Sequence, residues 1–200
     1  ALRDANKKNN IVVVLENDIS NYYEMECLFK HHKPTYVFHQ ASMLTLDSKL
    51  YRQKAVKVNI CGMSNILDLC VKYNVEKLVY ASSASVYGTP KTFPTSESHD
   101  FENCKLLYGA TKVADEYLAR SYADEEGLKF VGLRYFNVYG ERQSTNNVYT
   151  QIVPKWINAI VNGEPITIFG DGTQTMDMIH GDDVGLANVQ AMFNDVLYRN

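Results

Sequence analysis

The sequence predicts an α/β fold, a doubly wound parallel sheet with helices on both faces, and two observations carry this prediction. Short apolar runs alternate along the chain with longer segments of helical periodicity, which is the pattern of parallel strands joined by crossover helices. Polar side chains follow several of the predicted strands directly. Since the carboxyl ends of parallel strands meet at one edge of such a sheet, we expect a ligand site at that edge.

Four apolar runs are predicted to be strands of this sheet. They comprise residues 11–15, 36–39, 77–81 and 129–135. The run from Ile11 to Leu15 is uninterrupted and rich in valine, so we expect it to be a buried strand. A further strand is predicted at residues 166–169, directly before the turn formers Gly170, Asp171 and Gly172.

Three helices are predicted between these strands. They comprise residues 22–31, residues 52–73 and a segment that carries Tyr108 and ends near Gly127. The segment 52–73 is apolar around much of its circumference, so we expect it to be heavily buried. On the third helix, Glu116 and Arg120 are expected to pair on the outer face, because side chains four residues apart are neighbours there.

The character of the sequence changes after Asn137. The predicted elements there are a polar loop at 141–150, a short helix at 154–161 and a last helix that Asp182 or Asp183 caps. We therefore predict two units. Residues 1–137 form the main domain, and residues 138–200 form part of a smaller lobe that covers the substrate, with a helix that returns to the sheet.

Composition limits the class of protein. The chain has 200 residues, of which 46% are hydrophobic and 22% charged, as in ordinary soluble domains. A net charge of -3 gives no reason to expect nucleic acid or an anionic membrane as a partner, and no run is apolar enough to span a bilayer. The cysteines Cys27, Cys61, Cys70 and Cys104 lack metal-site spacing. We expect reduced, packed thiols in a cytoplasmic protein without a metal.

One short motif carries chemistry. Tyr108 and Lys112 stand four residues apart, so they share one face of a helix. A nearby ammonium favours the phenolate and lowers the pKa of a phenol from about 10. Such a pair is common on solvated helix faces. Its position after a predicted strand that ends in Ser82 and Ser83 favours a proton-transfer site, in which Ser83 holds a substrate oxygen against the phenol.

Six motifs follow one another in order, and together they are far more specific than any one of them. They read VFHQA (37–41), VNICG (58–62), VYASSASVYG (79–88), YGATK (108–112), LRYFNVYG (133–140) and FGDG (169–172). With these motifs the chain resembles the extended short-chain dehydrogenases/reductases, specifically the NAD-dependent epimerase/dehydratase family that acts on nucleotide sugars. The resemblance implies a Rossmann-like fold over almost the whole chain.

The resemblance also implies cofactor contacts. These are Asp18 and Ile19 at the adenine, Gln40, Ala41 and Asn59 along the path to the nicotinamide, and Phe136 packed near it. Lys112 is implied to bind the nicotinamide ribose of NAD and to hold Tyr108 as a phenolate-like base. Tyr108 would then remove the proton from a sugar hydroxyl.

The substrate contacts and the reaction follow from the same resemblance. Ser83 is implied to bond the sugar 4-hydroxyl and Asn137 to contact the nucleotide diphosphate. Family members that dehydrate or decarboxylate carry acidic residues where this chain has Ala84 and Ser85. That difference favours a nucleotide-sugar epimerase, with C4 inversion of a UDP-sugar through a 4-keto intermediate. The alternatives are another reductase, dehydratase or decarboxylase of the family, or a truncated, non-catalytic nucleotide-binding fragment.

Two features depart from the family pattern. The first βαβ portion of the fold, with its glycine-rich phosphate turn, has no counterpart in these residues, so we expect this piece alone to bind NAD poorly. Met176 stands where the family usually has an arginine, and methionine cannot donate hydrogen bonds to a diphosphate. The resemblance further implies a homodimer, in which the segment 52–73 and the Tyr108 helix form the contact.

Overall fold

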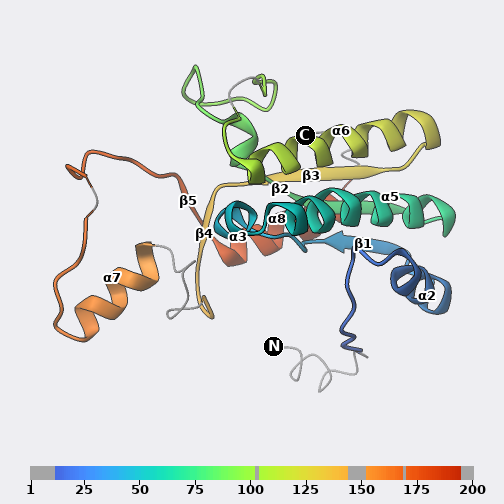
Figure 1. Ribbon diagram of the computed structural model, residues 1–200, viewed down its shortest axis with the longest axis horizontal. Helices are drawn as coiled ribbons and strands as arrows, with labels where there is room; N and C mark the ends of the chain where they lie inside the picture. Colours follow the sequence, from blue (N-terminus) through green and yellow to red (C-terminus); the bar gives the residue numbers. More distant parts are fainter. Residues whose placement is uncertain (1–11, 102–103, 144–151, 169, 195–200) are drawn as a thin grey trace.

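The computed structural model describes residues 12–101, 104–143, 152–168 and 170–194. Its centre is a parallel sheet of three strands in the order β1 (Tyr36–His39), β2 (Lys77–Ser83) and β3 (Phe130–Tyr135) (Figure 1). The register pairs His39 with Tyr80, and Ser83 with Tyr135. The carboxyl ends of the strands therefore meet at one edge, and the predicted parallel α/β fold is confirmed.

Helices cover both faces of this sheet, as the strand pattern requires. On one face, α2 (Tyr22–His32), α5 (Gly62–Lys72) and α6 (Leu107–Glu126) pack against Leu78, Tyr80 and Phe130. On the other face, α8 (Gly181–Phe193) packs its Ala191 and Met192 against Val79 and Val131. Neighbouring residues of one strand thus enter different cores, because successive side chains of a strand point to opposite faces.

The predicted helical segment 52–73 is confirmed, although it is not one regular α-helix. It consists of α4 (Arg52–Ala55), the π-helix η1 (Val56–Cys61) and α5. Its residues Met63, Leu67 and Leu69 are fully buried, which agrees with the predicted heavy burial. A π-helical turn inside a helix is uncommon and is frequent at functional sites. Here it contains Asn59.

Local sequence explains where the other helices begin and end. The Asn21 side chain accepts a hydrogen bond from the backbone amide of Glu24 and caps α2. Gly127 ends α6 in the left-handed conformation at φ 71°, which glycine adopts without strain. Two short helices were not predicted. They are α3 (Thr45–Leu50) and the 3₁₀ helix η2 (Ala84–Tyr87).

The C-terminal third adds a second, smaller sheet. In it, β4 (Asn137–Tyr139) pairs in parallel with β5 (Met178–His180), while α7 (Ile152–Val161) lies farther from the main sheet (Figure 1). The last helix, α8, was predicted to be capped by Asp182 or Asp183. That prediction is wrong, because the imidazole of His180 caps it and the two aspartates lie in its first turn. The division into two units at residue 137 remains a prediction. Most of the predicted loop at 141–150 lies outside the described residues.

Two predicted strands are wrong over the residues that the structure describes. Residues 12–15 form no strand, and Val13 and Val14 are 61% and 68% exposed. Residues 166–168 form none either, and Ile168 is 52% exposed. Apolar side chains alone do not make a strand, because the backbone needs a ladder partner. Neither segment is paired in the two sheets of the described chain. Residues 11 and 169, which belong to these predictions, lie outside the described residues.

The cysteine prediction is correct for one thiol and wrong for two. Cys70 is buried, and burial raises its pKa to about 12, so this thiol packs and is inert. Cys27 and Cys61 are exposed rather than packed, while Cys104 is half-buried. Within the described ranges, no three metal-ligating side chains gather at one point. No helix in that part of the chain has the length and apolarity to cross a membrane.

Candidate active site

Ser83 lies at the carboxyl end of β2, where the chain turns into η2. Its hydroxyl oxygen accepts a hydrogen bond from the backbone amide of Ser85 (3.2 Å) and donates to the Ser85 hydroxyl (3.1 Å). Ser83 thus caps the 3₁₀ turn with its own side chain. This fixes the position of its hydroxyl at the edge of the sheet where the strand ends meet.

Tyr108 lies in the first turn of α6, close to η2. A side chain at Gly109 would place its Cβ 2.7 Å from the carbonyl oxygen of Ser85, so glycine is what allows the helix to approach η2. Burial raises the pKa of the Tyr108 phenol above 10, a hydrogen bond with Ser83 opposes this, and the charge of Asp115 adds to it. Ser83 and Tyr108 are therefore brought together as predicted.

The prediction that Lys112 lowers the pKa of the Tyr108 phenol is wrong in this structure. The Lys112 ammonium forms an ion pair with Asp115, three residues further along α6, with Nζ and Oδ2 3.2 Å apart. Lys112 does not lower the pKa of Tyr108 here, and the net shift is upward. The first cause is burial of the phenol, and the charge of Asp115, which holds the lysine, adds to the rise.

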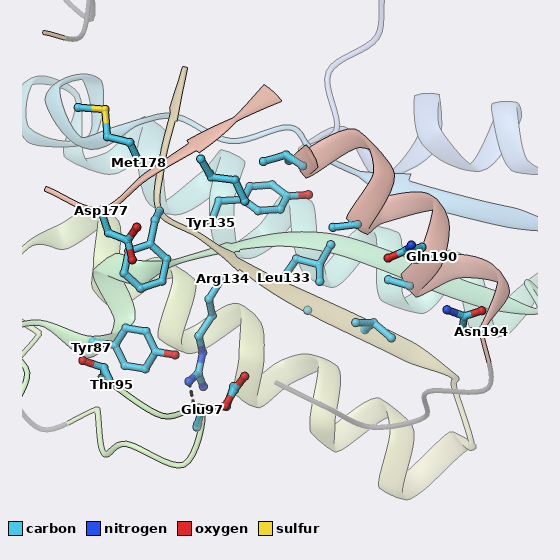
Figure 2. Close-up of a pocket in the computed structure, with 17 residues that line it drawn as sticks. Tyr87, Thr95, Glu97, Leu133, Arg134, Tyr135, Asp177, Met178, Gln190 and Asn194 are labelled. Carbon is cyan, nitrogen blue, oxygen red and sulfur yellow. Dashed lines mark hydrogen bonds between the residues drawn. The ribbon is translucent and has the colours of Figure 1, made fainter. Parts of the chain in front are cut away.

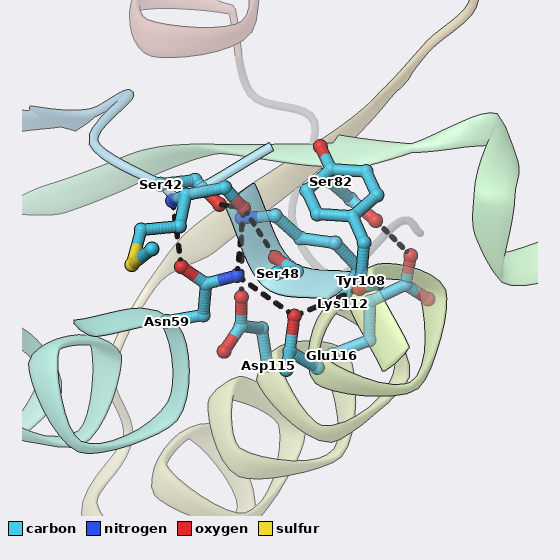
Figure 3. Close-up of polar contacts among 10 residues, drawn as sticks. Ser42, Ser48, Asn59, Ser82, Tyr108, Lys112, Asp115 and Glu116 are labelled. Carbon is cyan, nitrogen blue, oxygen red and sulfur yellow. Dashed lines mark hydrogen bonds and ion pairs between the residues drawn. The ribbon is translucent and has the colours of Figure 1, made fainter. Parts of the chain in front are cut away.

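Asn59 and Thr111 fix the backbone beside Lys112 (Figure 3). The Asn59 amide donates to the carbonyl of Met43 and accepts from the Met43 amide. It also donates to the Thr111 hydroxyl (3.0 Å), which donates to the carbonyl of Tyr108 (2.7 Å). Asn59 therefore lies beside the helix of Tyr108 and Lys112, and its amide is occupied by protein groups; its predicted place on the path to the nicotinamide remains a prediction.

A second group of predicted residues meets at the other side of the site. Ile19, Gln40 and Ala41 line a cavity of about 510 Å³ beside β1. Ile19 also packs on α5, since a Cβ at Gly62 would lie 2.7 Å from its Cδ1 atom. Asp18 is exposed, and its carboxylate accepts from the amide and hydroxyl of Ser20 ahead of α2.

Gln40 connects three elements at the sheet edge. Its amide donates to Asn188 of α8, and its carbonyl oxygen accepts from the hydroxyl of Tyr135 (3.0 Å). Asn188 in turn donates to the Tyr135 hydroxyl (2.6 Å). These bonds join the end of β1 to β3 and to the returning helix.

The remaining predicted residues lie farther along the chain. Phe136 is 40% exposed and its ring packs near that of Tyr87, with centroids 6.3 Å apart. The Asn137 amide donates to the carbonyl of Asp177 (2.8 Å), so it joins the strands of the small sheet. Met176 is 51% exposed. None of these three is in the group formed by Ser83, Tyr108 and Lys112.

A buried ion pair supports the strand that carries Ser83. The guanidinium of Arg134 donates to both carboxylate oxygens of Glu116 (2.9 and 2.7 Å), and the Ser82 hydroxyl donates to one of them. The predicted pair of Glu116 with Arg120 on the outer face of α6 is therefore wrong. Glu116 is 1% exposed, because that side of the helix packs on the sheet.

Arg134 also reaches the segment after η2 (Figure 2). It donates to the backbone carbonyl of Glu97 (2.8 Å), and its guanidinium lies 4.9 Å from the centre of the Tyr87 ring. An adjacent cavity of about 650 Å³ runs between β3, β5 and α8 and has largely apolar walls. Ser83, Tyr108 and Lys112 do not line it, so the candidate active site is at the strand ends instead.

The chain is similar to known proteins along almost its whole length. Residues 2–197 match the NAD dependent epimerase/dehydratase family. The chain belongs to this family. A putative UDP-glucose 4-epimerase of Methanocaldococcus jannaschii is 34% identical over 161 residues, which are 78% of this chain and 51% of that protein. The chain spans about half the length of the curated relatives it matches first.

Solved structures agree with this assignment. UDP-glucose 4-epimerase from Thermotoga maritima, solved with UDP-glucose, has a TM-score of 0.86 and 34% identity, covering 93% of this chain and 61% of that one. The UDP-glucose 4-epimerase of Thermus thermophilus, solved as a complex with NAD, has a TM-score of 0.80 and 32% identity, covering 89% and 59%. The fold is therefore the Rossmann-like fold of this NAD-dependent family.

Some residues of this candidate site were not predicted from the sequence. They are Thr111 and Met43 beside Asn59, His39 behind Lys112, and the buried acids Asp115 and Glu116. The helical spacing that places Lys112 below Tyr108 also places Asp115 and Glu116 one turn further, so that signal was present. For Met43 no signal exists in the sequence, because only its backbone takes part.

Proposed function

We propose that the protein is an NAD-dependent nucleotide-sugar epimerase that inverts C4 of a UDP-sugar through a 4-keto intermediate. The observation that carries this proposal is the pairing of Ser83 with Tyr108 at the carboxyl end of β2, with Lys112 one helical turn away. A phenol aligned by a hydroxyl is suited to moving the proton of a sugar alcohol. The relatives named above support the same reaction class.

The chain offers groups that fit NAD. The walls of the cavity beside β1 are mostly apolar, with Ile19 among them, and they include the polar Gln40, which suits an adenosine and its ribose. The Lys112 ammonium has three donors, and Asp115 accepts from it among the described residues. NAD would accept a hydride from the sugar carbon and return it. Asp18, Ala41, Asn59 and Phe136 are proposed as the further cofactor contacts.

In this proposal each residue has one task. Ser83 aligns the sugar 4-hydroxyl, and Tyr108 as a phenolate takes the hydroxyl proton and returns it to the inverted alcohol. The raised pKa of the phenol disfavours the phenolate in the cofactor-free site, so the Lys112 ammonium would have to stabilise it once it leaves Asp115. Lys112 holds the ribose. Asn137 is proposed to contact the nucleotide diphosphate, after release of its bond to Asp177. Dehydration and decarboxylation are less well supported, because Ala84 and Ser85 supply no carboxyl group beside the substrate.

The experiment is C4 inversion of a panel of UDP-sugars by the wild type and by Tyr108→Phe. The substitution keeps the ring and removes the proton acceptor, so we expect turnover to fall by about 10²–10⁴-fold. Tyr23→Phe is the control, since Tyr23 lies on α2 and is 78% exposed; its turnover should be unchanged. Near-normal inversion by Tyr108→Phe would place the base elsewhere, and no inversion by the wild type would favour a non-catalytic role.

We also propose a homodimer. The prediction assumed that a monomer could not cover the apolar faces of residues 52–73. That argument is weakened, because α5 buries its large apolar residues within one chain. Large apolar side chains remain exposed on the neighbouring helical surface, among them Leu50, Tyr51 and Tyr117. A cytoplasmic location remains a prediction.

A further inference from the structure

The ion pair between Lys112 and Asp115 has no task in the proposed reaction. Its side chains are only 2% and 1% exposed, and it lies between α6 and the π-helix η1 (Figure 3). Asp115 uses one oxygen, Oδ2, for the lysine. Its other oxygen, Oδ1, is buried and has no hydrogen-bond partner in the described part of the chain. Such an oxygen is costly, because a buried acceptor has lost its water.

The position of the ammonium creates a conflict with ligand binding. The Lys112 side chain is only 2% exposed and its ammonium is held by Asp115, so we expect it to move towards the site and away from Asp115 when it bonds a ribose hydroxyl. The carboxylate would then remain as a buried charge without its counter-ion, which is strongly unfavourable. A buried carboxylate that loses its partner neutralises by taking up a proton instead.

We propose that Asp115 is a positioning residue for Lys112: it holds the ammonium back from the cofactor site, and it takes up one proton from solvent when the ribose draws the ammonium away. Cofactor binding is then coupled to protonation of Asp115. The inference rests on the proposed function, since it needs NAD to bind at Lys112.

The surroundings of Asp115 support this coupling. Burial raises its pKa to about 7, while Lys112 holds it down and the charge of Glu116 adds to the rise. The carboxyl is therefore close to half-ionised at neutral pH in the cofactor-free protein. When Lys112 moves away, its charge and its hydrogen bond no longer hold the pKa of Asp115 down. The pKa of Asp115 therefore rises further when the cofactor binds.

The pKa values of the neighbouring His39, Tyr80 and Tyr108 lie outside the range from pH 6 to 8. On β1, burial and the charge of Lys112 lower the pKa of His39 to about 4. On β2, burial raises the pKa of Tyr80 well above 10, and on α6 burial raises that of Tyr108. On β3, Arg134 is paired with Glu116. The π-helix and α3 present Asn59 and Ser48 to the site, while their Lys57 and Lys49 are exposed and Asp47 is half-exposed.

The test is calorimetric titration of the whole protein with NAD in buffers of different ionisation enthalpy, which counts the protons taken up. We expect uptake to approach about one proton per bound NAD at pH 8 and to fall close to zero at pH 6. NAD affinity should accordingly fall by up to about tenfold per pH unit above 7. Asp115→Asn keeps a hydrogen-bond acceptor for Lys112 but cannot be protonated, so both effects should disappear in it.

Asp124→Asn is the control, because Asp124 is an exposed aspartate on the same helix; it should retain the proton uptake of the wild type. If Asp115→Asn does not fold, a ¹³C-carboxyl NMR titration of the wild type replaces it, and the Asp115 signal should titrate at a higher pH with NAD than without. Equal uptake in wild type and Asp115→Asn, or an NMR titration that NAD leaves unchanged, would overturn the inference. If NAD binds at no pH tested, the proposed function is overturned instead.

Discussion

Replacing Glu116 by glutamine should destabilise the fold strongly, although the change removes a single charge. Glu116 is the counter-ion of Arg134, and the side chains of this pair are 2% and 5% exposed. In Glu116→Gln the guanidinium stays buried and loses both charge-assisted bonds to the carboxylate. The Ser82 hydroxyl loses its carboxylate acceptor as well.

The size of the effect follows from what remains around Arg134. Breaking a buried ion pair from one side costs about 3–5 kcal/mol. The glutamine carbonyl still accepts one bond, the Glu97 carbonyl remains, and the rings of Tyr87 and Phe101 lie 4.9 and 5.2 Å from the guanidinium. Cation–π contacts of this kind contribute about 0.5–2 kcal/mol. We therefore expect the free energy of unfolding to fall by an amount near the lower end of that range, about 3 kcal/mol.

Urea unfolding of wild type and variant measures this loss directly. Glu125→Gln is the matched control, because Glu125 lies exposed on the same helix and accepts a hydrogen bond from the Ser121 hydroxyl at the surface; it should change stability by less than about 0.5 kcal/mol. The double variant Glu116→Gln with Arg134→Met should be more stable than Glu116→Gln alone, since no unpaired charge remains. A loss below about 1 kcal/mol in Glu116→Gln, the range of exposed pairs, would refute the argument from burial.

Two further predictions concern stability and assembly. The folded-state pKa of His39 is lowered from 6.5 to about 4, so its contribution to stability is complete above pH 6.5 and is lost as the pH falls towards 4. From pH 7 to pH 5 the free energy of unfolding in urea should fall by about 2 kcal/mol more for the wild type than for His39→Gln. Equal losses in the two proteins would show that His39 is not buried as a neutral ring. Light scattering should give a dimer mass, and a monomer mass throughout the micromolar range would contradict the proposed homodimer.

Much of the fold could be predicted because the local pattern and the tertiary structure agree. Strand 77–81 and the first half of strand 129–135 are buried within a parallel sheet, so their apolar runs are strong signals. The strand at 36–39 was predicted as well, although Tyr36 and Phe38 are exposed. The same rule failed at residues 12–15, which are equally rich in valine and leucine but have no strand beside them in the described sheets. Composition indicates that a segment can form a strand, but the segment becomes one only if its backbone pairs with a neighbouring strand.

At the candidate site, sequence by itself determined which groups meet. The four-residue spacing of Tyr108 and Lys112 and the position of Ser83 after a strand were sufficient to place all three at one sheet edge. The charge state of the site could not be determined in this way. Whether Lys112 acts on Tyr108 depends on which other charges lie within a few ångströms and on how much water reaches them.

Only the tertiary structure decided those questions. It buried Asp115 against Lys112 and turned Glu116 inward to Arg134, where helical periodicity alone favoured an exposed pair with Arg120. The physical reason is that helical spacing determines which residues share a face, but packing against β2, β3 and η1 determines which face loses its water. Desolvation then changes the pKa values and the cost of an unpaired charge, and so sets what the Tyr108 and Lys112 side chains can do.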